Sequence, residues 1–72
     1  MWVLKNNHMN YGTVKKWNQM DGWGFIEGDD GYDYFINISN LRRGIKIREG
    51  TKVKFDITHG QRGDEAENVA LV

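Results

Sequence analysis

The sequence predicts an all-β domain in the form of a small closed barrel of five short strands. Apolar and polar residues alternate over several short stretches, which is the pattern of strands that are buried on one face. Turn-forming residues separate these stretches, and nine glycines in 72 residues supply many of them. No stretch has the period of a long helix. Closing five strands into a barrel also removes the exposed edges of the sheet.

The first strand is expected over Asn10–Asn18, where Val14 falls on the inward face. The alternation breaks at Lys16 and Trp17, because a polar residue stands where an inward one is due. A β-bulge at this point would redirect the chain. A loop over residues 18–22 then leads to the second strand.

The second and third strands are expected over Gly22–Glu27 and Asp33–Asn37, joined as a hairpin by a turn-rich segment. Trp23 and Phe25 share one face of the second strand, since alternate side chains of a strand point the same way. The hairpin brings Phe35 beside them. Three aromatic rings on one surface suit the stacking of nucleic-acid bases, which contributes about 1–3 kcal/mol per base.

The second half of the chain predicts a helical turn and two further strands. Ser39 is a suitable N-cap for a turn that ends at Leu41, and a basic connection of residues 42–50 follows. Strands are expected over Thr51–Thr58 and Glu65–Leu71, with a polar loop of residues 59–64 between them. The predicted core consists of the inward apolar residues, namely Val14, Ile26, Tyr34, Ile36, Leu41, Val53, Phe55, Ile57, Val69 and Leu71.

The composition of the chain limits where the domain can begin and which classes of protein fit the sequence. Residues 1–8 do not continue the strand pattern and are expected to be a flexible extension, which leaves residues 9–72 as the domain. The chain has no cysteine, and His8 and His59 have no third ligand in view, so we expect no metal or other cofactor. No catalytic set is apparent, so we expect neither an enzyme nor a small-molecule substrate. No apolar run approaches the ~20 residues of a membrane span, which favours a cytoplasmic protein. We also expect a monomer.

The formal net charge is zero, but the charges are unevenly distributed along the chain. Six basic residues lie between Arg42 and Lys54, where only Glu49 opposes them, whereas the hairpin loop of residues 27–33 is acidic. This distribution is compatible with one basic side that faces a nucleic acid. It is equally compatible with an ordinary solvated surface of mixed charge.

Several segments resemble the cold-shock domain. Residues 12–18 resemble that family's first strand (GxVKWFN), Gly22–Ile26 resembles its first ribonucleoprotein motif (KGFGFI), and residues 33–39 resemble its second (DVFVHFS). The segments 60–63 and 66–69 resemble its closing part, so the similarity covers about residues 10–71. The resemblance implies an OB-fold barrel of five antiparallel strands. It also implies single-stranded RNA or DNA as the partner, bound on the first three strands.

Ten residues are the candidates for nucleic-acid binding. The resemblance implies the positions Lys15, Trp23, Phe25, Asp33, Phe35, Asn37, Ile38 and Arg62; the residues themselves add Lys16 and Trp17. The family's stacking tryptophan is replaced by Lys16, and its lysine before the first motif by Asp21. A histidine and a phenylalanine of the second motif are replaced by Asn37 and Ile38. Fewer stacking rings predict weaker binding.

Most of these candidates have a structural alternative. The two lysines contact phosphate or are ordinary surface lysines, and Arg62 pairs with phosphate or packs on a base. Asp33 reads a base edge or caps the turn, and Asn37 offers a donor and an acceptor or is simply an exposed strand residue. Trp17 stacks on a base or, in the interpretation that we favour, packs structurally.

The sequence therefore favours a single-strand nucleic-acid-binding protein that acts as an RNA chaperone or as a regulator of transcription or translation. The alternative is a protein-interaction module on a diverged barrel, which zero net charge and the missing aromatic residues favour. A third hypothesis is binding to structured RNA through the basic connection between Arg42 and Lys54.

Overall fold

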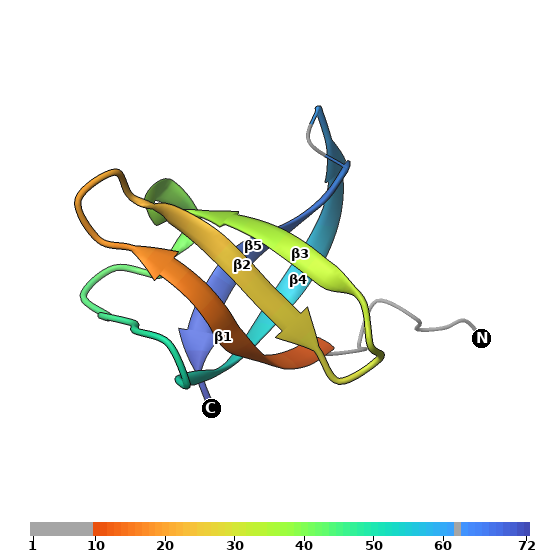
Figure 1. The fold of residues 1–72 in the computed structure, drawn as a ribbon, viewed down its shortest axis with the longest axis horizontal. Helices are drawn as coiled ribbons and strands as arrows, with labels where there is room; N and C mark the ends of the chain where they lie inside the picture. Colours follow the sequence, from red (N-terminus) through yellow and green to blue (C-terminus); the bar gives the residue numbers. More distant parts are fainter. Residues whose placement is uncertain (1–9, 62) are drawn as a thin grey trace.

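The computed structural model describes residues 10–61 and 63–72. The expectations for the extension 1–8 and for Arg62 lie outside these described residues. These described residues form five strands and one short 3-10 helix in the following order: β1 (Asn10–Asn18), β2 (Trp23–Gly28), β3 (Asp33–Asn37), η2 (Ile38–Asn40), β4 (Lys52–Gly60) and β5 (Gly63–Leu71) (Figure 1). The predicted all-β class and the number of strands are confirmed.

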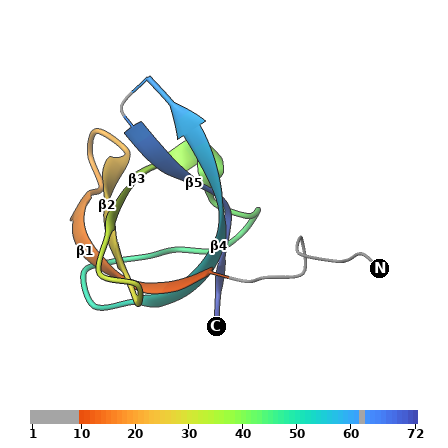
Figure 2. The ribbon, with the colours of Figure 1, turned by 90° about the vertical axis from the view of Figure 1, so that its right-hand side faces the viewer.

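The strands close into a barrel in the order β1-β2-β3-β5-β4. Figure 2 looks along this ring and shows β4 returning beside β1. Neighbouring strands are antiparallel except at one seam, where β3 and β5 run parallel and pair at Phe35 and Glu65. The expected antiparallel pairing is therefore found between all neighbouring strands except β3 and β5. These two strands run in the same direction where they meet.

A β-bulge in β1 determines which side chains face outward beside β2. Val14 pairs with Ile26 and Lys16 pairs with Phe25, so β1 has one residue more than β2 over this interval. The extra residue lets Lys15 and Lys16 both lie on the exposed surface. The predicted bulge is confirmed, one residue earlier than the sequence suggested.

The core agrees with the prediction except near the ends of the strands. The buried apolar residues are Val14, Ile26, Tyr34, Phe35, Ile36, Ile47, Val53, Phe55, Ala66 and Val69. Leu41 and Ile57 are partly buried against this cluster. The prediction for Leu71 is wrong, since its side chain is 46% exposed. Phe35, Ile47 and Ala66 are buried but were not in the predicted core.

One error in β5 comes from a second bulge. Asn68 has a positive φ of 52°, and the register between β4 and β5 shifts beside it. Because of this irregularity, the inward residues are Ala66 and Val69, three apart, rather than two residues with strand spacing. The bulge accounts for the burial of Ala66, which the sequence did not predict. Leu71 lies two residues after the inward Val69 and is exposed because it is the last residue of β5, at the end of the barrel.

Two local predictions about turns are also corrected. The segment 59–64 is mostly strand, because β4 and β5 continue to a tight connection at Gly60 and Gly63. Gly63 has a φ of 94°, which L-residues rarely adopt and which permits such a turn. The N-cap of the helical turn is Asn37 rather than Ser39: its side chain accepts a hydrogen bond from the Ser39 N–H at 3.0 Å.

A hydrogen bond at the start of β3 leads to a prediction about pH. The Tyr34 hydroxyl donates to the Asp30 carboxylate at 2.5 Å, and this bond together with burial raises the pKa of Tyr34 from 10 to about 12. The stabilisation is therefore complete below pH 10 and is lost as the pH rises from 10 to about 12. We expect Tyr34→Phe to lower the urea midpoint at pH 8 and to do so much less at pH 12.

Urea unfolding of both proteins, followed by circular dichroism across this range, measures the effect. Tyr32→Phe is the matched control, since that phenol is largely exposed on the same turn. Equal midpoints for Tyr34→Phe and the parent protein at pH 8 would show that the bond does not stabilise the fold.

Candidate nucleic-acid interface

Three aromatic side chains form one cluster on the outer face of β2 and β3. Phe25 lies directly opposite Phe35 in the register, and Trp23 lies diagonally from Phe35. Phe25 stands edge-on to both neighbours, with ring centroids 6.2 Å from Trp23 and 5.8 Å from Phe35. Trp23 and Phe35 are nearly parallel, with an interplanar angle of 15° and centroids 6.5 Å apart. The predicted grouping on one face is confirmed, whereas contact with nucleic acid stays a prediction.

The rings of this aromatic cluster are not equally accessible. Phe35 is only 8% exposed, whereas Trp23 and Phe25 are half-buried. Phe35 therefore contributes mainly by supporting the other two rings. Gly24 and Ile26, between and beyond the two rings of β2, point inward as the alternation predicts.

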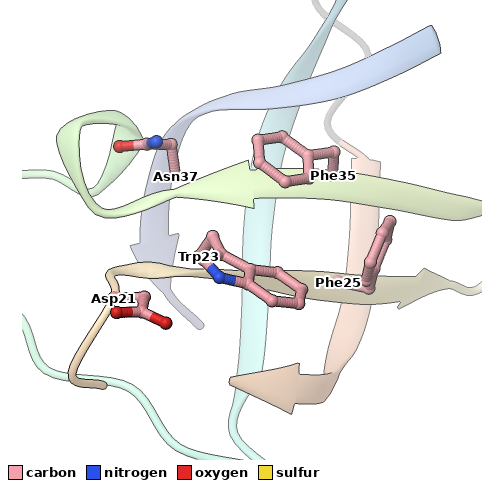
Figure 3. A pocket seen from close by; sticks show the side chains of 5 residues that line it. All are labelled: Asp21, Trp23, Phe25, Phe35 and Asn37. Carbon is pink, nitrogen blue, oxygen red and sulfur yellow. The ribbon is translucent and has the colours of Figure 1, made fainter. Parts of the chain in front are cut away.

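The aromatic cluster lines an open hollow of about 560 Å³ together with Asp21 and Asn37. Figure 3 shows these two polar residues on the same side of Trp23, with Phe25 and Phe35 on the other side. A flat ring on the aromatic surface would thus have a polar wall at one end. The volume lies within the range of small-ligand sites, roughly 300–1,000 Å³.

Asp21 is the residue of this site that sequence reasoning missed. In the sequence it stands out only as the residue that replaces a lysine before the first motif, and not as part of the site. The signal was its position two residues before Trp23, where the loop turns into β2. Asn18 holds it there: the Asn18 amide donates to the Asp21 carboxylate at 3.1 Å, and the Asp21 N–H donates to the Asn18 side chain at 3.0 Å.

Asn37 ends β3 and is fixed by the start of η2. Its Oδ1 atom accepts hydrogen bonds from the N–H and the hydroxyl of Ser39, each at 3.0 Å. Its backbone N–H donates to the Asn40 side chain at 3.1 Å. Because Oδ1 is engaged, the group that Asn37 offers to a ligand is the Nδ2 donor.

Lys16 adds a positive charge to the aromatic cluster. Its ammonium lies over the Trp23 ring, 5.6 Å from the centroid, which is within the range of a cation–π interaction. The bulge in β1 makes this possible by placing Lys16 opposite Phe25. The position that holds a stacking ring in the family thus holds a cation that contacts the next ring.

Lys15 and Asp33 are paired with each other across β1, β2 and β3. The Lys15 ammonium lies 3.0 Å from the Asp33 carboxylate, and both side chains are about half exposed. The hydrogen bond to Asp33 raises the pKa of Lys15 above its ordinary value. Such exposed pairs are weak, so either partner remains accessible to a ligand at little cost.

Trp17 and Ile38 lie apart from this hollow, in a second one of about 320 Å³. Three basic residues of the connection after η2, Arg42, Arg43 and Lys46, share its lining. The Trp17 ring packs against the core, and its indole N–H donates to Gln19 at 2.8 Å. The structural alternative for Trp17 is therefore the one that its contacts favour.

We also searched the described residues for metal-ligand clusters and for membrane-spanning helices. Within residues 10–61 and 63–72, no three His, Cys, Asp or Glu side chains are grouped to hold a metal ion. In the same residues, no helix is long and apolar enough to cross a membrane.

A five-stranded closed barrel with an aromatic cluster on β2 and β3 is an OB-fold barrel. The 'Cold-shock' DNA-binding domain family matches residues 10–72. The chain belongs to this cold-shock domain family, as the motifs of the first three strands suggest.

Curated relatives agree over most of their length. The chain is 46% identical over 63 residues to cold shock protein CspC of Bacillus subtilis, covering 85% of this chain and 96% of the relative. It is 44% identical over 63 residues to the major cold shock protein of Streptococcus pyogenes serotype M18, covering 85% and 94%. Among solved structures, Drosophila Unr CSD456 matches with a TM-score of 0.75 at 15% identity. That match covers 90% of this chain and 27% of the longer one, and it supports the fold alone.

Proposed function

We propose that this protein binds single-stranded RNA or DNA, with bases stacked on Trp23 and Phe25 and supported by Phe35. The observation that carries the proposal is the open hollow with an aromatic floor and a polar wall at one end. Stacking on such a surface requires an unpaired base, because the face of a paired base is covered by its neighbours in the helix. The family description, which names DNA binding, supports the same class of ligand.

Because it prefers unpaired bases, the protein would act as an RNA chaperone or as a regulator of transcription or translation. A protein that binds the unpaired state and not the paired state shifts the equilibrium toward open strands by mass action. No energy source is needed, and the proposal includes no catalysis. It also includes action as a monomer in the cytoplasm, as the sequence predicts.

The experiment is a tryptophan-fluorescence titration with a short uridine or thymidine strand at 50 mM and 200 mM salt. We expect saturable quenching, since a base stacks on Trp23, and weaker affinity at the higher salt because phosphate contacts release counterions. Lys15 and Lys16 are the cations nearest the aromatic cluster, so the dependence on salt is expected to be shallow. A duplex of the same sequence is the control and should quench little.

The same titration separates the alternative function. A protein-interaction module would use the apolar surface of Trp23 and Phe25 against a protein and would not quench with short strands. The absence of quenching up to high micromolar strand would refute the proposed function and favour that alternative. Binding only to structured RNA, with none to short strands, would instead point to the basic connection that includes Arg42 and Arg43.

A further inference from the structure

We infer that the hollow on β2 and β3 selects among bases, and that Asp21 together with Asn37 favours guanine over uracil. This inference rests on the proposed function and specifies it, since it names the base that the aromatic cluster receives. It follows from the chemistry of the polar wall, which no part of the aromatic surface provides. Stacking alone is tolerant of sequence, because every base has a π-face.

The first step is the placement of an acceptor. The Asp21 carboxylate lines the same hollow as Trp23, and Figure 3 shows it beside the indole. Two hydrogen bonds with Asn18 hold the residue in place. Each carboxylate oxygen can accept two hydrogen bonds, so the bond from Asn18 leaves acceptor capacity on both oxygens.

The second step is the placement of a donor at the same end. Asn37 lines the hollow from β3, and its Oδ1 atom is engaged by Ser39. Its Nδ2 group therefore has donors to offer. The wall thus presents one donor group from Asn37 at the end of β3 and two acceptor oxygens from Asp21 in the turn before β2.

The third step compares this array with the Watson–Crick edges of the bases. Guanine presents the O6 acceptor followed by the N1–H and N2–H donors, which complement one donor and a carboxylate. Uracil has acceptors on both sides of its N3–H, so one of its carbonyl oxygens would face a carboxylate oxygen. Cytosine and adenine each place a single amino donor beside a ring acceptor. Guanine alone offers the carboxylate two adjacent donors, which is the bidentate arrangement that discriminates bases most strongly.

The charges indicate that a base edge, and not a phosphate, faces this wall. A carboxylate repels a phosphate, so the backbone of a bound strand would avoid Asp21. Lys16 lies on β1, and its ammonium is 5.6 Å from the centroid of the Trp23 ring that lines the hollow. The strand is therefore expected to place its phosphates toward β1 and its base edges toward Asp21 and Asn37.

The test measures the affinity of three seven-nucleotide RNAs by fluorescence anisotropy: U7, U3GU3 and U3IU3. We expect U3GU3 to bind about tenfold more tightly than U7, since a bidentate pair contributes roughly that factor or more. Inosine lacks the 2-amino group, so U3IU3 should lose most of this gain. Comparison within one set of strands cancels the phosphate contribution, which is common to all three.

Asp21→Asn is the decisive variant, because it retains an oxygen that can accept the bond from Asn18 but loses the pair of acceptors. We expect the preference for U3GU3 over U7 to fall close to onefold. Asp29→Asn is the matched control: it changes the net charge equally on the exposed turn after β2, outside this hollow, and should keep the preference.

The outcomes separate the inference from the proposed function. Salt-sensitive binding of all three strands with no preference for guanosine would overturn the inference and leave the proposed function standing. A preference that Asp21→Asn does not reduce would also overturn it, as would equal effects of the two variants. Failure of every strand to bind would refute the proposed function itself.

Discussion

Replacing Trp23 with alanine is expected to weaken single-strand binding by roughly ten- to a hundredfold. A stacked base contributes about 1–3 kcal/mol, and about 1.4 kcal/mol corresponds to a factor of ten. Trp23 is half-buried and lies outside the buried core cluster, so the barrel should remain folded. Anisotropy of a labelled strand measures the change, because the variant has lost the tryptophan that reports binding in the fluorescence titration.

Tyr32→Ala is the matched control for this variant. It removes an aromatic ring that is 69% exposed on the β2–β3 turn, away from the aromatic cluster. Phe35 would be a poorer test, because it is 8% exposed and its truncation would mix loss of binding with loss of stability. If folded Trp23→Ala binds as tightly as the parent protein, the aromatic cluster is not the binding surface.

Gly24→Ala is expected to destabilise the fold by about 3 kcal/mol or more, the upper end of overpacking effects. A methyl group at Gly24 would lie 2.0 Å from the backbone carbonyl oxygen of Lys16, in a place where real Cβ atoms do not occur. The obstacle is backbone, so no side-chain rotation relieves it. Either β1 or β2 must shift, and the aromatic cluster would move with β2. Urea unfolding followed by circular dichroism measures the loss.

Gly31→Ala provides the control for this second variant. Gly31 has a φ of +90°, so alanine there is strained, but nothing lies within 4 Å of its added methyl group. We expect a cost of about 1 kcal/mol from the backbone alone. Equal urea midpoints for the two variants would mean that β1 and β2 do not approach as closely as the structure shows.

The sequence predicts the barrel because strand periodicity is a local signal. Val53, Phe55 and the Trp23–Phe25 pair obey the alternation without help from distant residues, and their faces are as predicted. The two bulges are harder to place. The bulge in β1 left a visible break at Lys16, whereas Asn68 adopts a positive φ that nothing in the local pattern requires. The burial of Ala66 could therefore not be predicted from the alternation, and Leu71 is exposed because it ends β5.

The part of the site that consists of strand residues could be predicted from the sequence. The aromatic rings lie together because their register is fixed by the hairpin. The ion pair between Lys15 and Asp33 joins residues that are 18 positions apart, and the bulge in β1 decides where Lys15 lies. A local sequence pattern therefore could not predict this pair. In the sequence Asp21 is only the replacement of a lysine, and the geometry of the hollow is needed to show that it lies beside Trp23.

The parallel seam between β3 and β5 is the place where local opening of the barrel would occur. β3 and β5 meet at Phe35 and Glu65, and farther along Leu41 bridges to Val69. Phe35 thus belongs both to this closure and to the support of the aromatic cluster. Opening of the ring at this seam would loosen the surface on which bases stack, and a stacked strand would in turn hold the ring shut. Occupancy of the surface and closure of the barrel both involve Phe35.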